Sequence, residues 1–228
     1  MPKPIGGKAA AALIPAGAVI MFGGFLGCGN PHRFIVELAE LGTKDLTVIC
    51  NDGALPNGPD GDEFYGVAKL IHNKQVKKLI CTHVGTNPEV ARQMNEGTLD
   101  VSLIPQGSFA EMIRAGGAGL GGVLTPTGYG TIVREASHVH SVVEIDGRHY
   151  LLERPLRADY AVVYGYKVDP FGNVWYKGTT RNFSPWMAMA ADTVIVEAEN
   201  LVGAGEIEPE NIITPGVLVD YIMTGREV

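Results

Sequence analysis

Short apolar runs alternate with helix-like patterns along the first 115 residues. The runs at residues 19–22, 46–50, 79–82 and 101–104 are brief and almost continuously apolar. Such runs are typical of parallel strands that are covered on both faces. Helical spacing follows them at residues 31–41, 67–72, 88–95 and 109–115. The alternation predicts an α/β fold built on a doubly wound, mostly parallel sheet.

Turn signals dominate the second half of the chain. Asp146-Gly147 separates strand-like runs at 142–145 and 149–153 and is a strong hairpin signal. Residues 169–173 form another turn, between runs at 161–166 and 174–177, and a last strong strand is expected at 193–198. We therefore expect added antiparallel strands. The sequence has no internal repeat and no clear linker, so residues 1–228 are predicted to form a single domain.

Several side chains are typical of helix starts. Asn30 is expected to cap the helix in which Pro31 is the first residue, and Asn182 to cap a helix that ends near residue 191. Ser108-x-x-Glu111 fits a capping box. The Pro- and Gly-rich segment at 53–66 is expected to form an exposed loop.

Composition excludes some functions. The net charge of −7 argues against a nucleic-acid-binding surface, and no apolar run is long enough to cross a membrane. The three cysteines are isolated, which favours a reduced, cytoplasmic compartment. All three are expected to be small core residues, with Cys28 near a ligand as the alternative. The six histidines lack metal-ligand spacing, so no metal is predicted; His138 and His140 are expected on an exposed face.

A glycine-rich loop follows the first predicted strand. It consists of Gly23, Gly24, Phe25, Leu26, Gly27, Cys28 and Gly29. A strand, a glycine-rich turn and a helix start can present backbone N–H groups to an anion. The glycine order is G-x-x-G-x-G, the reverse of the dinucleotide fingerprint, and no P-loop lysine follows. The spacing leaves two interpretations open: phosphate or pyrophosphate binding, or a tight turn without a ligand.

Polar residues follow the other predicted strands, where ligands of open α/β sheets bind. They include Asn51 and Asp52 after the second strand, His83 after the third, and Gln106 after the fourth. The Gln106 amide, fixed between Pro and Gly, could stabilise an oxyanion or bond to a neighbouring loop. The sequence contains no G-x-S-x-G and no H-E-x-x-H motif. A backbone-lined surface without a nucleophile suggests half of an active site.

The chain resembles the α subunit of family I CoA-transferases of the short-chain acyl or 3-oxoacid type, most closely butyrate–acetoacetate CoA-transferases. The resemblance runs from about residue 10 to 219, and its segments occur in the expected order. They lie at residues 23–31, 49–52, 85–88, 105–107, 113–119, 124–130, 152–159 and 181–183.

The resemblance implies an enzyme that moves CoA between a short-chain acyl-CoA and a free carboxylic acid by a ping-pong route. The nucleophilic glutamate is implied on a β subunit in an α2β2 assembly, with CoA as substrate and no permanent cofactor. The CoA-binding motif falls on residues 23–29, the oxyanion-hole glutamine on Gln106, and a polar residue near the acyl carboxylate on Asn51. Acetate, acetoacetate, butyrate and hydroxylated short acids all remain candidate acids.

One residue and one segment depart from the family pattern. Ala16 replaces the usual Asp or Asn before Gly17, and the 53–66 segment looks longer and more acidic than usual, which bears on acyl specificity. The alternatives are a sugar-phosphate isomerase-like enzyme with a phosphate at the glycine loop, and a non-catalytic scaffold subunit.

Overall fold

The computed structural model describes residues 1–58, 61 and 63–224. The strands of the main sheet are β1 (Lys3–Ile5), β2 (Val19–Phe22), β3 (Leu46–Ile49), β4 (Val76–Cys81), β5 (Asp100–Leu103), β9 (Ala158–Val168), β10 (Val174–Trp175), β11 (Ala191–Leu201) and β12 (Tyr221–Met223). The α-helices are α1 (Gly7–Ala11), α2 (His32–Leu41), α3 (Val67–His72), α4 (Pro88–Asn95), α5 (Gln106–Gly117) and α6 (Ser184–Met189). The described residues also form 3-10 helices, namely η1 (Ile132–Glu135), η2 (Gly178–Arg181), η3 (Pro209–Asn211) and η4 (Gly216–Leu218).

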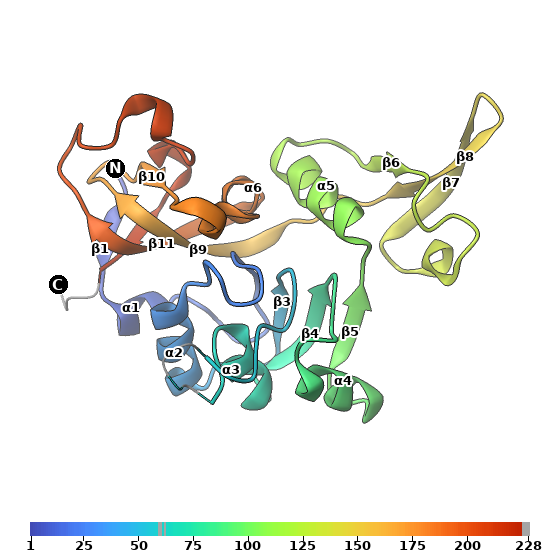
Figure 1. Cartoon of the computed structure of the whole chain (residues 1–228), viewed down its shortest axis with the longest axis horizontal. Helices are drawn as coiled ribbons and strands as arrows, with labels where there is room; N and C mark the ends of the chain where they lie inside the picture. The colour runs from blue at the N-terminus through green and yellow to red at the C-terminus, as the bar shows by residue number, and fades with distance from the viewer. Residues whose placement is uncertain (59–60, 62, 225–228) are drawn as a thin grey trace.

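The main sheet is parallel apart from its shortest strand. Its order is β1-β12-β11-β9-β2-β3-β4-β5, every neighbouring pair in that order is parallel, and β10 pairs antiparallel with β9 (Figure 1). From β2 the chain builds outward to β5 and then returns to β9 on the other side of β2. This reversal is a topological switch point, where open α/β sheets leave a crevice for a ligand. The glycine-rich loop leaves β2 at that point.

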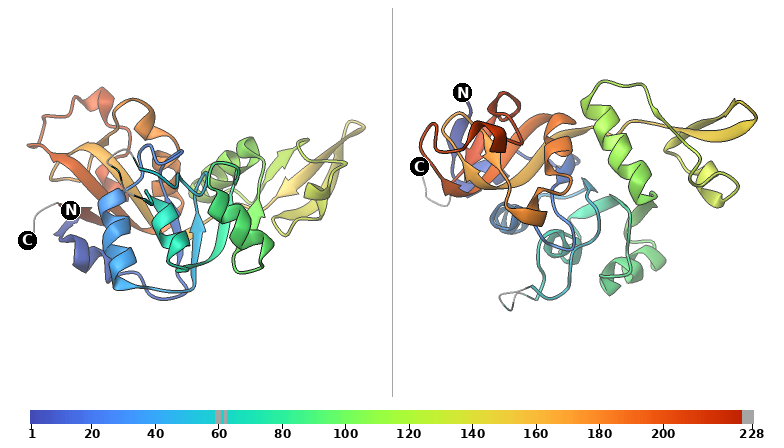
Figure 2. Two further views of the ribbon diagram at one scale, coloured as in Figure 1. Left: turned by 60° about the horizontal axis from the view of Figure 1, so that its bottom comes forward. Right: turned by 45° about the horizontal axis from the view of Figure 1, so that its top comes forward.

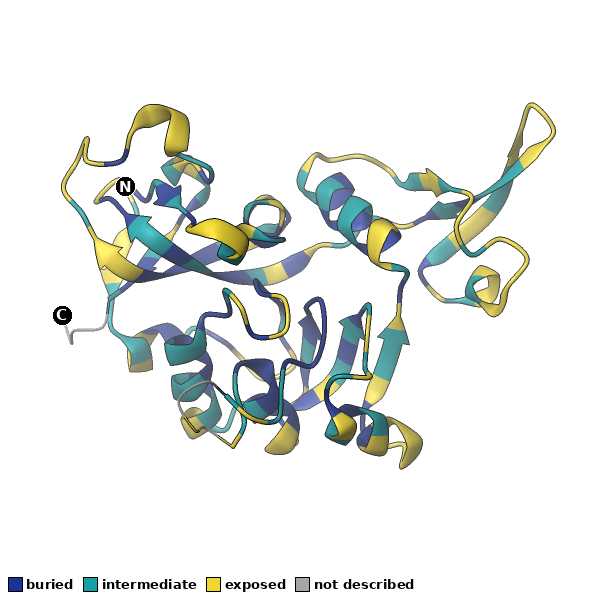
Figure 3. Ribbon diagram, viewed as in Figure 1, coloured by how far each residue is buried: buried dark blue, intermediate teal, exposed yellow. Residues whose placement is uncertain are grey.

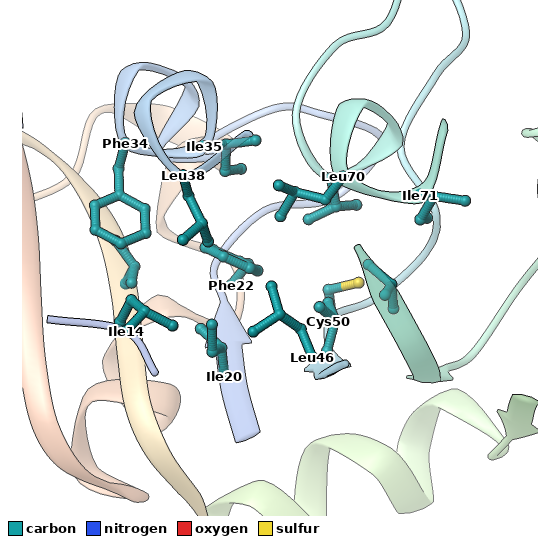
Figure 4. Close-up of a cluster of buried hydrophobic side chains, with 14 of the residues drawn as sticks. Ile14, Ile20, Phe22, Phe34, Ile35, Leu38, Leu46, Cys50, Leu70 and Ile71 are labelled. Carbon is teal, nitrogen blue, oxygen red and sulfur yellow. The ribbon is translucent and has the colours of Figure 1, made fainter. Parts of the chain in front are cut away.

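Helices cover both faces of the sheet, as its apolar strands require. On one face Phe34, Ile35 and Leu38 of α2 pack over Ile20 and other residues of the sheet (Figure 4). On the other face Phe109 and Met112 of α5 and Met187 of α6 pack on the residues that alternate with these. Alternation within β2 illustrates the arrangement, because Ile20 and Phe22 belong to the first cluster and Met21 to the second. Burial along the strands follows from this double cover (Figure 3). The predicted doubly wound α/β fold is confirmed.

The predicted hairpin belongs to a second, smaller sheet. The strands β6 (Val123–Thr125), β7 (Val139–Ile145) and β8 (Arg148–Glu153) pair antiparallel in the order β6-β8-β7. This sheet extends from the body as an arm next to α5 (Figures 1 and 2). The added antiparallel strands are therefore present, but all except β10 form a sheet of their own. The run predicted at 161–166 lies inside β9, which is parallel to its neighbours β2 and β11.

Three predicted helix caps are wrong. Pro31 occupies the N-cap position of α2, and the Asn30 amide bonds to Gly23 O instead. The N-cap of α5 is Pro105, which places Ser108 inside the helix. Helix α6 begins after Phe183, so Asn182 lies outside it. In each case a polar side chain near a helix start has a tertiary position that local spacing does not reveal.

The segment at 53–66 is only partly the exposed loop expected. Residues 59, 60 and 62 lie outside the described residues, and of the others Gly53, Ala54 and Gly66 are buried while Asn57 and Glu63 are exposed. The ends of the segment are thus packed against the body. Among the helices in the described part of the chain, none has the length and apolar character needed to cross a membrane.

Candidate functional site

The glycine-rich loop folds into a two-residue β-hairpin. Phe25 and Cys28 exchange backbone hydrogen bonds of 3.0 and 2.9 Å. Between them Leu26 and Gly27 have φ values of 50° and 82°. Positive φ at both central residues is typical of a type I′ turn, which matches the twist of paired strands. Phe25 and Leu26 are exposed at the tip, so the loop presents a small apolar surface rather than an open cradle of N–H groups.

Two asparagines hold the base of this hairpin. Asn30 Nδ2 donates to the carbonyl of Gly23 across 2.5 Å. From the other side Asn182 Oδ1 accepts the N–H of Gly24 at 3.0 Å, while its Nδ2 donates to the carbonyl of Cys28 at 3.1 Å. Asn182 adopts φ 22°, a sparsely populated conformation for a residue with a side chain. The loop is therefore fixed by Asn30, which directly follows it, and by Asn182, which is 158 positions from Gly24 in the sequence.

Two backbone N–H groups of the described loop have no acceptor. Within the described residues, those of Gly27 and Gly29 donate to no acceptor, whereas the others between residues 23 and 30 are bonded. Both positions require glycine. Their φ values are 82° and 80°, and a Cβ would lie 2.7 Å from Tyr65 Cδ1 at Gly27 and 2.6 Å from Thr180 O at Gly29.

A pocket of about 340 Å³ opens beside the hairpin. Its walls include residues 27–30, Arg33 at the start of α2, and Tyr164, Glu197 and Glu199 from β9 and β11. Arg33 Nε lies 3.4 Å from Glu197 Oε1. Burial raises the pKa of Glu197 although Arg33 and two backbone N–H groups oppose it, and burial raises the pKa of Tyr164 to about 12. Because Arg33 is matched by Glu197 and Glu199 adds a further carboxylate, the pocket wall favours N–H donors over a polyanion.

Gln106 and Asn51 meet at the carboxyl end of the sheet. Gln106 Nε2 donates to Asn51 Oδ1 across 3.2 Å, and the Thr82 hydroxyl donates to the same oxygen at 3.2 Å. Asn51 is only 2% exposed, whereas Gln106 is exposed at the first position of α5. One N–H of the Gln106 amide is used in this contact and the other can face a ligand. The N-terminus of the twelve-residue α5 adds a positive electrostatic potential at the same place.

Asp52 joins this pair to the hairpin. Its Oδ2 accepts the N–H of Leu26 at 2.9 Å and Nδ2 of Asn51 at 2.7 Å, and its Oδ1 accepts the N–H of Ala54 at 2.8 Å. Asp52 is 4% exposed. The sequence placed Asp52 at the correct edge of the sheet without giving it a role. Asn182 was misassigned as a cap, and no local signal distinguishes it.

Other candidate residues differ in their surroundings. Cys28 is exposed and lines the pocket, so the expectation that all three cysteines are core residues is wrong for it; Cys50 and Cys81 are buried. His138 is buried next to Glu153, contrary to the expected exposed face, while His140 is exposed. Within the part of the chain that the structure describes, no three His, Cys, Asp or Glu side chains are grouped so that they could hold a metal ion.

Comparison with known proteins identifies the family. A family model described as Coenzyme A transferase matches residues 7–225. The chain belongs to the coenzyme A transferase family. An acetoacetyl-CoA:acetate/butyrate CoA transferase alpha subunit of Clostridium acetobutylicum is 51% identical over 207 residues, which cover 91% of this chain and 90% of that protein. An acetate CoA-transferase subunit alpha of Escherichia coli is 47% identical over 211 residues, covering 92% and 91%. The expected enzyme class, a CoA-transferase, and the α-subunit assignment are confirmed.

Solved structures confirm the fold of this coenzyme A transferase chain. An acyl-CoA transferase from Escherichia coli O157:H7, in a thioester complex with CoA, superposes with a TM-score of 0.81 at 20% identity. The match covers 97% of this chain but 47% of that one, so this chain spans about half of that polypeptide. Glutaconate coenzyme A-transferase from Acidaminococcus fermentans gives a TM-score of 0.80 at 19% identity and covers 97% and 75% of the two chains.

Proposed function

We propose that this chain supplies the CoA-binding loop and the oxyanion donor of a CoA-transferase that moves CoA between a short-chain acyl-CoA and a free carboxylic acid. The observation that carries the proposal is the Gln106 amide. It is exposed at the N-terminus of α5 and held by Asn51. This donor lies at the carboxyl end of the sheet, as does the glycine-rich hairpin, and no serine or cysteine nucleophile motif accompanies it. Such a surface suits a site that a second subunit completes.

The chemistry assigned to the pair of subunits is covalent. A glutamate carboxylate of the β subunit attacks the thioester carbonyl, the CoA thiolate leaves, and an acyl anhydride forms. The thiolate then attacks the glutamyl carbonyl of the anhydride and releases the free acid, which leaves an enzyme–CoA thioester. The acceptor carboxylate reverses these steps. Gln106 donates to the oxyanion that develops at the attacked carbonyl, and Asn51 lies toward the acyl carboxylate.

Residues 23–29 are assigned to CoA through the free N–H groups of Gly27 and Gly29 and the exposed apolar tip. A pocket of about 340 Å³ is too small for all of CoA. It accommodates part of the molecule, and the partner covers the rest. The acidic wall formed by Glu197 and Glu199 fits the amide-containing arm of CoA better than its phosphates.

The partner subunit and the cellular location are proposed on the basis of the same family resemblance. We assign an α2β2 assembly with a β subunit, no permanently bound cofactor and a cytoplasmic location. The three free cysteines support a reducing compartment. Acetoacetyl-, butyryl- and acetyl-CoA are the donors to test first. The 53–66 segment is a candidate specificity element because it follows the strand that leads to Asn51, the residue assigned to the acyl carboxylate.

The decisive assay measures CoA transfer from acetoacetyl-CoA or butyryl-CoA to acetate. The chain is assayed alone and then with the β subunit co-expressed from the same genome. Activity only in the pair supports the shared site. Activity of the chain alone would place the nucleophile here, with Glu197 and Glu199 as the first residues to replace. Inactivity of the pair with a wide panel of acids would overturn the proposal.

The two other functions make different predictions. A sugar-phosphate isomerase needs an acid and a base in this chain, and isomerase activity of the purified single chain would favour it. A scaffold subunit predicts that substitutions at Gln106 and Asn51 leave activity unchanged while loss of the chain destroys the complex.

A further inference from the structure

We propose that Asp52 is a positioning residue that couples the glycine-rich hairpin to the oxyanion donor. Its carboxylate is the point where the two parts of the site meet. The same oxygen, Oδ2, accepts the N–H of Leu26 at the tip of the hairpin and an N–H of the Asn51 amide. Asn51 in turn accepts from Gln106. The inference rests on the proposed function and assigns no substrate contact to Asp52.

The number of acceptors explains why a carboxylate is needed. Three N–H donors converge on two oxygens of a side chain that is 4% exposed, so little water can replace a lost partner. Asparagine at this position would offer one acceptor oxygen and turn an NH₂ group toward one or two N–H donors. Either the Ala54 turn or the Leu26–Asn51 pair would lose its acceptor.

Orientation of the Gln106 amide depends on this arrangement. Asn51 directs Oδ1 at Gln106 because its Nδ2 is held by Asp52, on the opposite side of the same amide. Rotation of the Asn51 amide would replace the oxygen facing Gln106 Nε2 with an NH₂ group, and the donor would lose its partner. Asp52 also fixes Leu26, whose φ of 50° needs support from its surroundings.

A simpler role for Asp52 is a local turn, and two variants separate the roles. Asp52 Oδ1 accepts from Ala54 N, two residues on, which is an Asx-turn. Asp52→Ser keeps a hydroxyl able to form the equivalent turn but lacks the second oxygen that reaches Leu26 and Asn51. Asp52→Asn keeps the shape and removes the charge. Asp169→Asn is the matched control, since Asp169 is 3% exposed and accepts from the N–H groups of Phe171 and Asn173 in a distant turn.

The test uses the complex with the β subunit. Asp52→Asn and Asp52→Ser should lower kcat on the order of 10²-fold, as misplacement of a catalytic group does. In a Gln106→Ala background the same substitutions should cost less than about 3-fold, because the donor they orient is gone. Amide hydrogen exchange at Leu26 should accelerate in both variants. Asp169→Asn should leave kcat unchanged.

The outcomes are distinguishable. An active parent with an unaffected Asp52→Ser variant would overturn the role of Asp52 and leave the proposed function intact. The role of Asp52 would also be overturned if kcat of the Asp52→Asn, Gln106→Ala double variant fell by the full product of the two single losses. A parental complex without CoA transfer would overturn the proposed function, and protected exchange at Leu26 in the Asp52 variants would independently overturn the contact to the hairpin.

Discussion

The side chains of Gln106 and Asn51, which are 55 positions apart in the sequence, are joined by a 3.2 Å hydrogen bond. The bond links the loop after β3 to the first residue of α5. It leaves one amide N–H of Gln106 directed away from Asn51, at the positive end of a helix. A donor that is held in advance costs little reorganisation when negative charge develops beside it.

Replacement of Gln106 by Ala should lower kcat on the order of 10²-fold, as loss of an oxyanion donor does. Steady-state kinetics of the complex with the β subunit measure the loss. Asn95→Ala, an exposed amide at the end of α4, is the control. A Gln106→Ala enzyme with parental kcat would remove Gln106 from the oxyanion site.

Substitution of Gly27 by Val should raise the KM for acyl-CoA. A side chain there meets Tyr65 and must adopt φ 82°, which distorts the hairpin and blocks its free N–H. Gly42→Ala is the matched control, because Gly42 has φ 75° with nothing within 4 Å of its Cβ position. It should cost about 1 kcal/mol of stability without a change in KM. Equal effects of the two substitutions on KM would place the CoA site elsewhere.

Asn182→Ala should also weaken acyl-CoA binding, because the N–H of Gly24 and the carbonyl of Cys28 lose their partner. We expect a rise in KM and a loss of about 0.5–1.5 kcal/mol in unfolding free energy, as for a typical intramolecular hydrogen bond, because the two contacts are partly buried and exposed. Asn200→Ala, which removes an exposed amide bonded to Tyr166 O, should change neither. Urea unfolding and kinetics measure the two effects, and an unchanged KM would show that the loop keeps its shape without Asn182.

Thiol labelling should report on the pocket. Cys28 is exposed and lines the pocket, whereas burial raises the pKa of the Cys50 and Cys81 thiols, that of Cys81 to about 12. A thiol-reactive reagent should therefore modify about one cysteine per native chain, at Cys28, and a bound acyl-CoA should slow the reaction. Mass spectrometry locates the label. Labelling that is insensitive to acyl-CoA would separate Cys28 from the CoA site.

Stability should depend on pH through Glu153. This carboxyl lies buried in β8, with 3.8 Å between its Oε1 and His138 Nε2. Burial raises the pKa of Glu153, and among the described residues neither of its carboxylate oxygens has a hydrogen-bond partner. Because the pKa of Glu153 is higher in the folded chain, this carboxyl stabilises the fold at pH values below its ordinary pKa of 4.5. The stabilisation is lost as pH rises through the pKa of the folded state.

Glu153→Gln should therefore gain stability relative to the parent on going from about pH 5 to about pH 8. Burial lowers the pKa of His138, so its own contribution is present above 6.5 and is lost as pH falls, but His138 remains in both proteins. Urea unfolding across this range measures the difference. The exposed Glu144→Gln is the control, and a difference that does not vary with pH would contradict the expectation.

The sequence by itself determined the layers of the fold and the edge of the sheet at which we propose the site. Apolar runs such as Val19–Phe22 and helices such as Pro88–Asn95 lie where the spacing predicts them. The prediction of these elements succeeds because strand and helix periodicity depends on residues that are only a few positions apart in the sequence. The resemblance assigned roles to Gln106 and Asn51, and the structure places the two side chains in contact.

Only the tertiary structure decided which polar groups hold the site together. Asn182 bonds to Gly24 from 158 positions away and Asp52 to Leu26 from 26 positions away. Sequence spacing does not predict such pairs, because the two residues of each pair come together only when β2, β3 and β9 pack at the switch point. For the same reason Asn182 resembled a helix cap. Packing determines which side chains remain free to act.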